Sequence, residues 1–153
     1  MVKRRRLAVG YSTPRPIDKK LINVSQAPTT TQAETTLFTA RGACTVAGLR
    51  WDLQAYGNGA EFCGWALVLI RDGQTTPSIV VSTGGASFYE PEQDVLAFGR
   101  WNGAISGSVV TRWTDSTKTM RKLKDGDKIV FLSRANASST DEILGTFQLF
   151  CKE

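Results

Sequence analysis

From residue 32 to residue 151, the chain alternates between short apolar runs and clusters of Gly, Asn, Asp and Ser. The apolar runs are rich in Val, Ile, Thr, Phe and Trp, and no long stretch shows the 3.6-residue period of a helix. Residues 44–54 alternate most regularly, with apolar side chains on one side and Arg50 and Asp52 on the other. This pattern predicts an all-β domain of strands separated by tight turns.

The predicted strands are residues 35–40, 44–54, 62–70, 78–82, 95–101, 109–113 with a continuation towards 123, 128–134 and 143–151. Residues 62–70 are apolar on both faces, as in a central strand that a facing sheet or a neighbouring subunit covers on each side. Residues 83–93 are predicted to form a long loop. About eight short strands at this spacing indicate an antiparallel sandwich or barrel, and the pattern does not decide which of these runs is the eighth strand.

The net charge of +5 is concentrated at the N-terminus. Residues 1–20 carry seven cations and one acid, whereas the other residues carry twelve cations and thirteen acids. Residues 1–29 are therefore predicted to be a flexible basic arm, disordered when free, on a body spanning residues 30–153. Such an arm is typical of proteins that hold nucleic acid, although a solubilising or import tail is the alternative. The candidate phosphate-binding cations are Lys3, Arg4, Arg5, Arg6, Arg15, Lys19 and Lys20.

A second basic stretch spans residues 118–128 and is interrupted by Asp125 and Asp127. It is either a solvated hairpin or a basic inner surface that touches phosphates, which makes Arg121, Lys122 and Lys124 further candidates. Residues 124–127 are predicted to form a type I′ hairpin turn between two strands and not a metal site, because Asp-Gly is a strong turn signal. The substitution Asp127→Asn is accordingly expected to be mild.

The residue types argue against an enzyme. Histidine is absent, which removes His-based nucleophile systems and His-ligated zinc, and neither a GxxxxGK(S/T) loop nor a GxGxxG after a strand is present. We therefore predict no catalytic residue, no cofactor and no metal site. Three cysteines without metal-ligand spacing favour buried thiols in a reducing compartment. No apolar run approaches the roughly 18 residues of a membrane span, so no membrane insertion is expected.

The four tryptophans fall into two groups. Trp51 and Trp65 lie on strongly apolar strands and are predicted to be in the core. Trp101 and Trp113 each follow an arginine. They either stack on bases or, as the simpler interpretation, lie at the edge of the sandwich or in a subunit contact.

Five segments, taken together, resemble the capsid proteins of small circular single-stranded DNA viruses of the circovirus-like, Rep-encoding group. They are residues 35–40 (TTLFTA), 65–69 (WALVL), 95–98 (VLAF), 120–129 (MRKLKDGDKI) and 145–152 (GTFQLFCK). The resemblance covers roughly residues 30–153. Phe38 stands where a histidine is common in the group, and the basic arm is short for it.

The resemblance implies a jelly roll of eight antiparallel strands whose copies assemble into an icosahedral shell. A single jelly roll of this size suits the simplest such shell, of about 60 identical subunits. The arm would then package a single-stranded DNA genome. Lys3, Arg4, Arg5 and Arg6 would also engage the host import machinery, placing the protein in the nucleus before assembly and in the virion after it.

Two other classes of protein stay open. One is a non-capsid single-stranded nucleic-acid-binding β-barrel, which would carry cations over its body, whereas this body is close to neutral. The other is a secreted lectin-like module, for which a leader segment and paired cysteines are expected. Neither feature is apparent in the sequence.

Overall fold

The computed structural model describes residues 17–56, 62–82, 85–87, 94–101, 111–118, 120–137 and 142–152. Within them the chain is all-β, in agreement with the alternating pattern of the sequence. The strands are β1 (Asp18–Gln26), β2 (Ala33–Thr39), β3 (Cys44–Tyr56), β4 (Cys63–Ile70), β5 (Val80–Ser82), β6 (Gly85–Ser87), β7 (Asp94–Trp101), β8 (Thr111–Thr117), β9 (Arg121–Leu123), β10 (Lys128–Ala135) and β11 (Glu142–Lys152).

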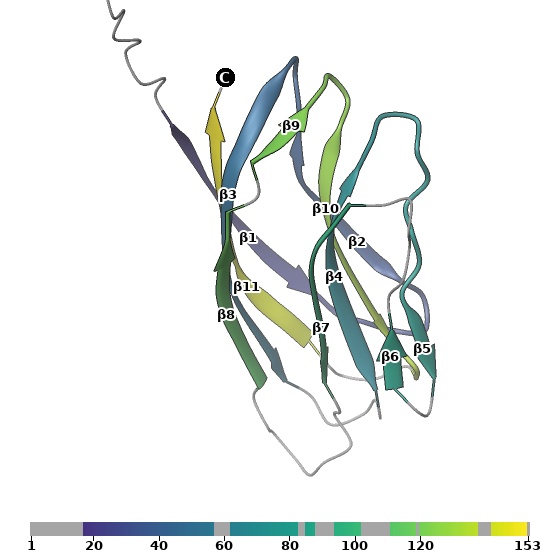
Figure 1. Ribbon diagram of the computed structural model, residues 1–153. Helices are drawn as coiled ribbons and strands as arrows, with labels where there is room; N and C mark the ends of the chain where they lie inside the picture. The colour runs from purple at the N-terminus through teal and green to yellow at the C-terminus, as the bar shows by residue number, and fades with distance from the viewer. Residues whose placement is uncertain are drawn as a thin grey trace, which may run out of the picture.

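The long strands form two antiparallel sheets packed face to face (Figure 1). Sheet A has the order β1-β11-β3-β8, and sheet B has the order β2-β10-β4-β7. The first long strand pairs with the last, the second with the second-last, the third with the third-last, and the middle two with each other. This nested pairing is a long hairpin wound into two sheets, which is the jelly-roll arrangement. The predicted fold class is therefore confirmed.

The core lies between the two sheets because the inward face of each central strand is apolar. Trp51 is 6% exposed and Trp65 is 1% exposed, so the prediction that both belong to the core is confirmed. Phe131 of β10 packs against Phe147 of β11, with ring centroids 5.2 Å apart. The two sheets are thus joined by aromatic side chains from four strands.

The outward face of β4 is also buried, as its apolar sequence predicted. Ala66, Val68 and Ile70 pack with Val130 and Leu132 of β10 into a second apolar cluster. The cover comes from the chain itself, since Ile79, just before β5, belongs to the same cluster. No neighbouring subunit is needed to shield this strand.

Strand β1 lies inside the segment predicted to be a flexible arm, so that prediction is wrong for residues 18–26. These residues pair along their whole length with β11, from Asp18 opposite Cys151 to Gln26 opposite Ile143. Val24 is in the core, and the buried Gln26 amide donates to Thr35 Oγ1 of β2 at 2.8 Å. Strand β1 is thus the eighth long strand, and it lies outside all the runs that the pattern predicted.

Two further segments differ from the prediction. The expected loop of residues 83–93 contains β6, which pairs with β5. The expected continuous strand from residue 109 towards 123 is divided into β8 and β9. Met120 lies at the break with a φ of 43°, a left-handed conformation that interrupts an extended strand.

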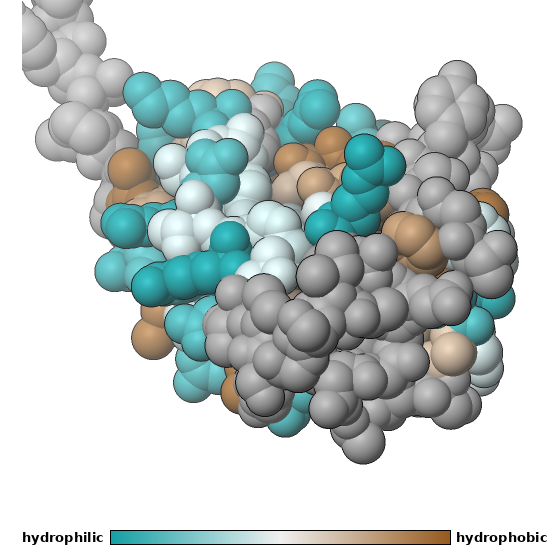
Figure 2. Space-filling view, turned by 90° about the horizontal axis from the view of Figure 1, so that it is seen from below, coloured by the Kyte–Doolittle hydropathy of each residue, from teal (hydrophilic) through white to brown (hydrophobic). Residues whose placement is uncertain are grey.

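Exposed large apolar side chains are scattered over the described surface. They are Ile17, Leu21, Val80, Val95, Phe98 and Met120. Seen from below, the hydrophobic residues form separate small patches between hydrophilic ones (Figure 2). Isolated apolar residues of this kind are normal on a protein surface.

Candidate nucleic-acid interface

Strand register brings many of the exposed or partly exposed cations of the body to one end of the sandwich. Lys19 pairs with Phe150, and Thr45 pairs with both Lys152 and Lys122, so the start of β1, the end of β11, the start of β3 and β9 lie together. This end is uppermost in Figure 1. We call it the cationic end; its members are Lys19, Lys20, Arg41, Arg121, Lys122, Lys124, Lys128 and Lys152.

The part of the basic arm that precedes β1, residues 1–16, joins the body at the same end. It leads into Ile17, which lies directly before β1. Lys3, Arg4, Arg5, Arg6 and Arg15 fall outside the described residues, so their roles in phosphate binding and nuclear import stay predictions. Lys19 and Lys20 belong to a strand and not to a flexible arm.

A groove opens at the cationic end between β1, β2 and the start of β3. It encloses about 700 Å³ and is lined by residues that include Lys20, Phe38, Arg41 and Cys44. The Lys20 ammonium lies over the Phe38 ring, 4.6 Å from its centroid. A partly exposed ring beside two cations can stack on a base while the cations contact phosphates. The sequence did not single out Phe38 for this role, because Lys20, the cation over its ring, comes from another strand.

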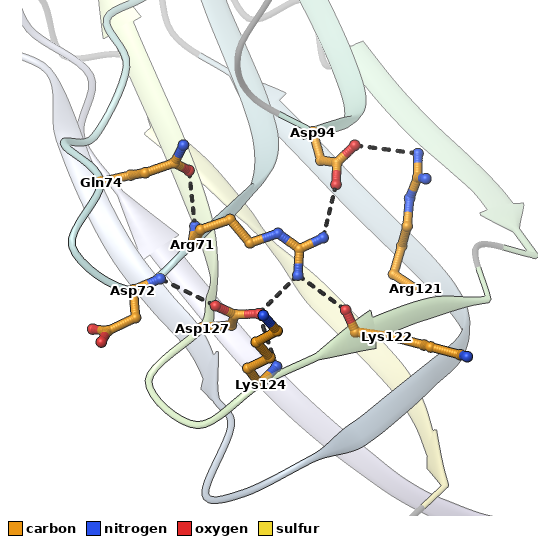
Figure 3. Close-up of polar contacts among 8 residues, drawn as sticks. All are labelled: Arg71, Asp72, Gln74, Asp94, Arg121, Lys122, Lys124 and Asp127. Carbon is orange, nitrogen blue, oxygen red and sulfur yellow. Dashed lines mark hydrogen bonds and ion pairs between the residues drawn. The ribbon is translucent and has the colours of Figure 1, made fainter.

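Asp127 anchors the β9–β10 turn from inside the protein (Figure 3). Asp127 is 2% exposed. Its carboxylate accepts hydrogen bonds from Arg71 Nη1 at 2.7 Å, Lys124 N at 2.9 Å and Asp72 N at 3.1 Å. Arg71 Nη1 also donates to the Lys122 carbonyl oxygen at 2.9 Å. The end of β4 is therefore tied to the backbone that carries Lys122 and Lys124.

Asp94 extends this network to β7 and β9. Its carboxylate accepts from Arg71 Nη2 at 3.3 Å and lies 3.5 Å from Arg121 Nη2. Arg121 is thus partly neutralised, whereas the Lys122 side chain points away from the network (Figure 3). Of the two, Lys122 is the more available to phosphates.

The electrostatics of Asp127 reflect two opposing effects. Burial disfavours the ionised carboxylate, but the Lys124 and Asp72 amides and the Arg71 guanidinium stabilise it more strongly. The pKa of Asp127 is therefore held below its ordinary value of 3.8. The carboxylate is a fixed anionic acceptor that holds three donors in place.

The predicted hairpin turn of residues 124–127 is a turn, but it is not a hairpin. The Asp127 amide donates to the Lys124 carbonyl at 3.2 Å, yet β9 pairs with β3 of sheet A while β10 belongs to sheet B. The turn therefore crosses between the sheets. Gly126 has a φ of 85°, and Asp125 is not among the described residues with positive φ, which excludes type I′.

Gly126 is required for a second reason that the sequence could not reveal. A Cβ atom at this position would lie 2.7 Å from Cγ of Asp72, in addition to the strained backbone. Asp127 is a buried acceptor of three donors, so we now expect Asp127→Asn to be destabilising and not mild.

Trp113 is half-buried and packs on the core, with its ring centroid 5.8 Å from that of Trp65. The structure therefore places it at the edge of the sandwich, the simpler of the two predictions for it. The side chain of Trp101 lies outside the described structure.

Among the described residues, no group of three or more His, Cys, Asp or Glu side chains is arranged to hold a metal ion. Nor does that part of the chain contain a helix long and apolar enough to cross a membrane.

No protein-family model matches the sequence, and no curated protein matches it. Among solved structures, the chain overlays on one described as the structure of infectious bursal disease virus Gx strain, with a TM-score of 0.33 and 10% sequence identity. The overlay covers 96% of this chain and 40% of the viral chain. This chain thus spans less than half the length of the viral chain, and an overlap at this level assigns no function.

Proposed function

We propose that the chain is a viral capsid protein, whose copies assemble into a closed shell and bind single-stranded nucleic acid at the cationic end. One observation carries the proposal: a jelly-roll body gathers exposed cations at the same end from which the basic arm leaves. A jelly roll alone is shared by lectins and cupins, so the charge arrangement is what favours this function.

The physical argument concerns how a polyanion is held. Lysine and arginine side chains of the arm and of the body would contact the same length of phosphate backbone, because the arm joins β1 just before Lys19 and Lys20. Contacts to phosphates carry no sequence information, which suits a protein that packages a whole genome. The groove beside Phe38 would add stacking on individual bases.

The finer features follow only from the resemblance of the sequence. We propose a shell of about 60 identical subunits, because closed symmetry is the usual end-point of homo-oligomers. A single-stranded DNA genome and nuclear import through Lys3, Arg4, Arg5 and Arg6 belong to the same proposal.

The purified protein is expected to form closed, roughly spherical particles. Size-exclusion chromatography with light scattering, followed by electron microscopy, measures this directly at several salt and protein concentrations. A protein that stays monomeric or dimeric under all these conditions is not a capsid protein.

Binding of single-stranded DNA is expected to weaken when the cationic end loses charge. The double variant Lys122→Gln/Lys124→Gln should reduce the slope of log K against log salt by roughly 1.4, and deletion of residues 2–16 by roughly 3.5. The truncation stops before β1 so that the fold is kept. Fluorescence anisotropy with an oligonucleotide of mixed sequence gives the slope.

The matched control is Arg50→Gln/Arg100→Gln, which removes the same charge from exposed positions on β3 and β7. Arg50 pairs with Ser116 and Arg100 with Gly64, away from β9. A control that lowers the slope as much as the Lys122/Lys124 variant would show that the binding surface is not the cationic end.

A further inference from the structure

Two lysines of the cationic end lie in one row across sheet A. Thr45 of β3 pairs with Lys122 of β9 on one side and with Lys152 of β11 on the other. Directly opposed residues of antiparallel strands project their side chains from the same face, so Thr45 lies between the two lysines. Neighbouring strands are about 4.8 Å apart, and the flexible lysine stems can therefore bring both ammonium groups over Thr45.

A pocket of about 310 Å³ opens at this row. We call it the β9 pocket; its lining includes Ala43, Thr45, Met120, Lys122, Leu123 and Lys152. Both lysines thus border one space, and the Lys122 side chain points away from the network around Asp127 (Figure 3). The other side chains of this lining are largely apolar.

The charges at the β9 pocket are unbalanced. The described residues that line it include two lysines and no acid. Neither ammonium group forms an ion pair with a described residue, whereas Arg121 Nη2 on the same strand lies 3.5 Å from the Asp94 carboxylate. Like charges directed at one space repel each other, and an anion between them removes that repulsion. The arrangement therefore favours an anionic group between the lysines.

The backbone of Met120, which also lines the pocket, is in an unusual conformation. Its φ of 43° is uncommon for a residue with a side chain, and strain of this kind concentrates at ligand-binding sites. Met120 is 62% exposed, so the conformation does not serve to bury its side chain in the core. Its result is to place a flexible apolar side chain beside the two lysines.

We propose that the β9 pocket binds one nucleotide of the bound strand, with the phosphate between Lys122 and Lys152 and the base against Met120. An inorganic anion needs only the lysines, whereas a nucleotide carries a flat ring that the apolar lining and the Met120 thioether can contact. The volume is at the lower end for small-molecule sites, which suits a single nucleotide. The inference rests on the proposed function and adds to it a fixed site on the body.

A double-mutant cycle tests whether the two lysines hold one phosphate. In fluorescence anisotropy with the mixed-sequence oligonucleotide, Lys122→Gln and Lys152→Gln are each expected to weaken binding about fivefold. The two together should weaken it by less than about tenfold, and not by the product of about 25-fold, because a phosphate that has lost one lysine is already displaced from the other.

Lys128→Gln is the control for this cycle. Lys128 opens β10 of sheet B and is not among the described residues that line the β9 pocket. Its effect on binding should therefore multiply with that of Lys152→Gln, as expected for residues that hold separate phosphates. Thermal melts check that each variant is folded.

Met120→Gly separates the base contact from folding. Glycine accepts a φ of 43° without strain, and the side chain that is lost is exposed, so the melting temperature should be unchanged or higher. Binding is nevertheless expected to weaken about threefold. The salt slope should stay the same, because no charge is lost. With an abasic oligonucleotide of the same length, Met120→Gly should bind as tightly as wild type.

The outcomes distinguish this inference from the proposed function. Effects of Lys122→Gln and Lys152→Gln that multiply, or that are absent, overturn the shared phosphate site. A Met120→Gly variant that binds both oligonucleotides as wild type does overturns the base contact. Either result leaves the proposed function standing, whereas wild-type protein that binds no single-stranded DNA overturns nucleic-acid binding as a whole.

Discussion

Replacing Asp127 by alanine is expected to lower the free energy of unfolding by about 3 kcal/mol. The substitution removes the acceptor of three donors, Arg71 Nη1 and the amides of Lys124 and Asp72, in a place that water does not reach. Arg71 itself is 40% exposed, so its charge is partly solvated and the loss stays near the lower end for a broken buried pair. Urea denaturation followed by tryptophan fluorescence measures the change.

Asp125→Ala is the control, because Asp125 lies two residues away in the same turn but is exposed. Its carboxylate accepts one hydrogen bond, from the Gly42 amide at 2.9 Å, so its loss should cost about 1 kcal/mol or less. Equal losses from the two variants would mean that the turn, and not the buried carboxylate, supports the fold.

Lowering the pH should remove the contribution of the Asp127 carboxylate to the free energy of unfolding. Its pKa is lower in the folded protein than the ordinary value of 3.8, so its contribution is fully present above that value and is lost as pH falls through the folded-state pKa. The difference in unfolding free energy between wild type and Asp127→Ala is therefore expected to shrink below about pH 4. A difference that is the same at pH 6 and pH 3 would contradict the ionised state of Asp127.

Gly145→Ala is expected to destabilise the protein by about 3 kcal/mol, or to prevent folding. Gly145 pairs with Leu53 at the centre of sheet A, and a Cβ atom there would lie 2.3 Å from the main-chain oxygen of Asp52 and 2.9 Å from Leu53 Cα. Because main-chain atoms cannot rotate away, β3 and β11 would have to separate. Thermal melts and the yield of assembled particles report the loss.

Gly48→Ala is the matched control on the neighbouring strand. A Cβ atom on Gly48 would meet its nearest neighbours at 3.5 and 3.7 Å, which are ordinary contact distances. Alanine in a strand at this position is expected to be neutral or slightly stabilising. A large loss from Gly48→Ala would show that replacing a glycine in sheet A is harmful in itself, rather than the close approach of β3 to β11 at Gly145.

The fold class and several strands were predictable because they depend on neighbours in sequence. The alternation of residues 44–54 and the apolar run of residues 62–70 became β3 and β4, since a period of two places every second side chain on one face. Strand β1 was missed because Asp18, Lys19 and Lys20 resemble the charged arm before them. Its strand conformation depends on pairing with β11 at the far end of the chain.

The candidate cations were also visible in the sequence, because a side chain keeps its charge whatever the fold. The clustering of these cations at one end could not be seen in the sequence, because strand register alone brings Lys19, Lys122 and Lys152 together. Asp127 was interpreted as an exposed turn residue because its partner Arg71 lies 56 positions earlier. Trp65 was correctly placed in the core, but the close packing of its indole against Gly99 of β7 could not be seen in the sequence.

Local patterns in the sequence were enough to predict the all-β class, the positions of most strands and turns, and the separation of a basic N-terminus from a near-neutral body. Periodicity and charge are local properties, and each can be evaluated from a short window. The tertiary structure alone decided that residues 18–26 are a strand, that residues 124–127 cross between sheets, and that Asp127 is a buried acceptor. Pairing, burial and hydrogen-bond partners join residues far apart in the chain, so no local window contains them.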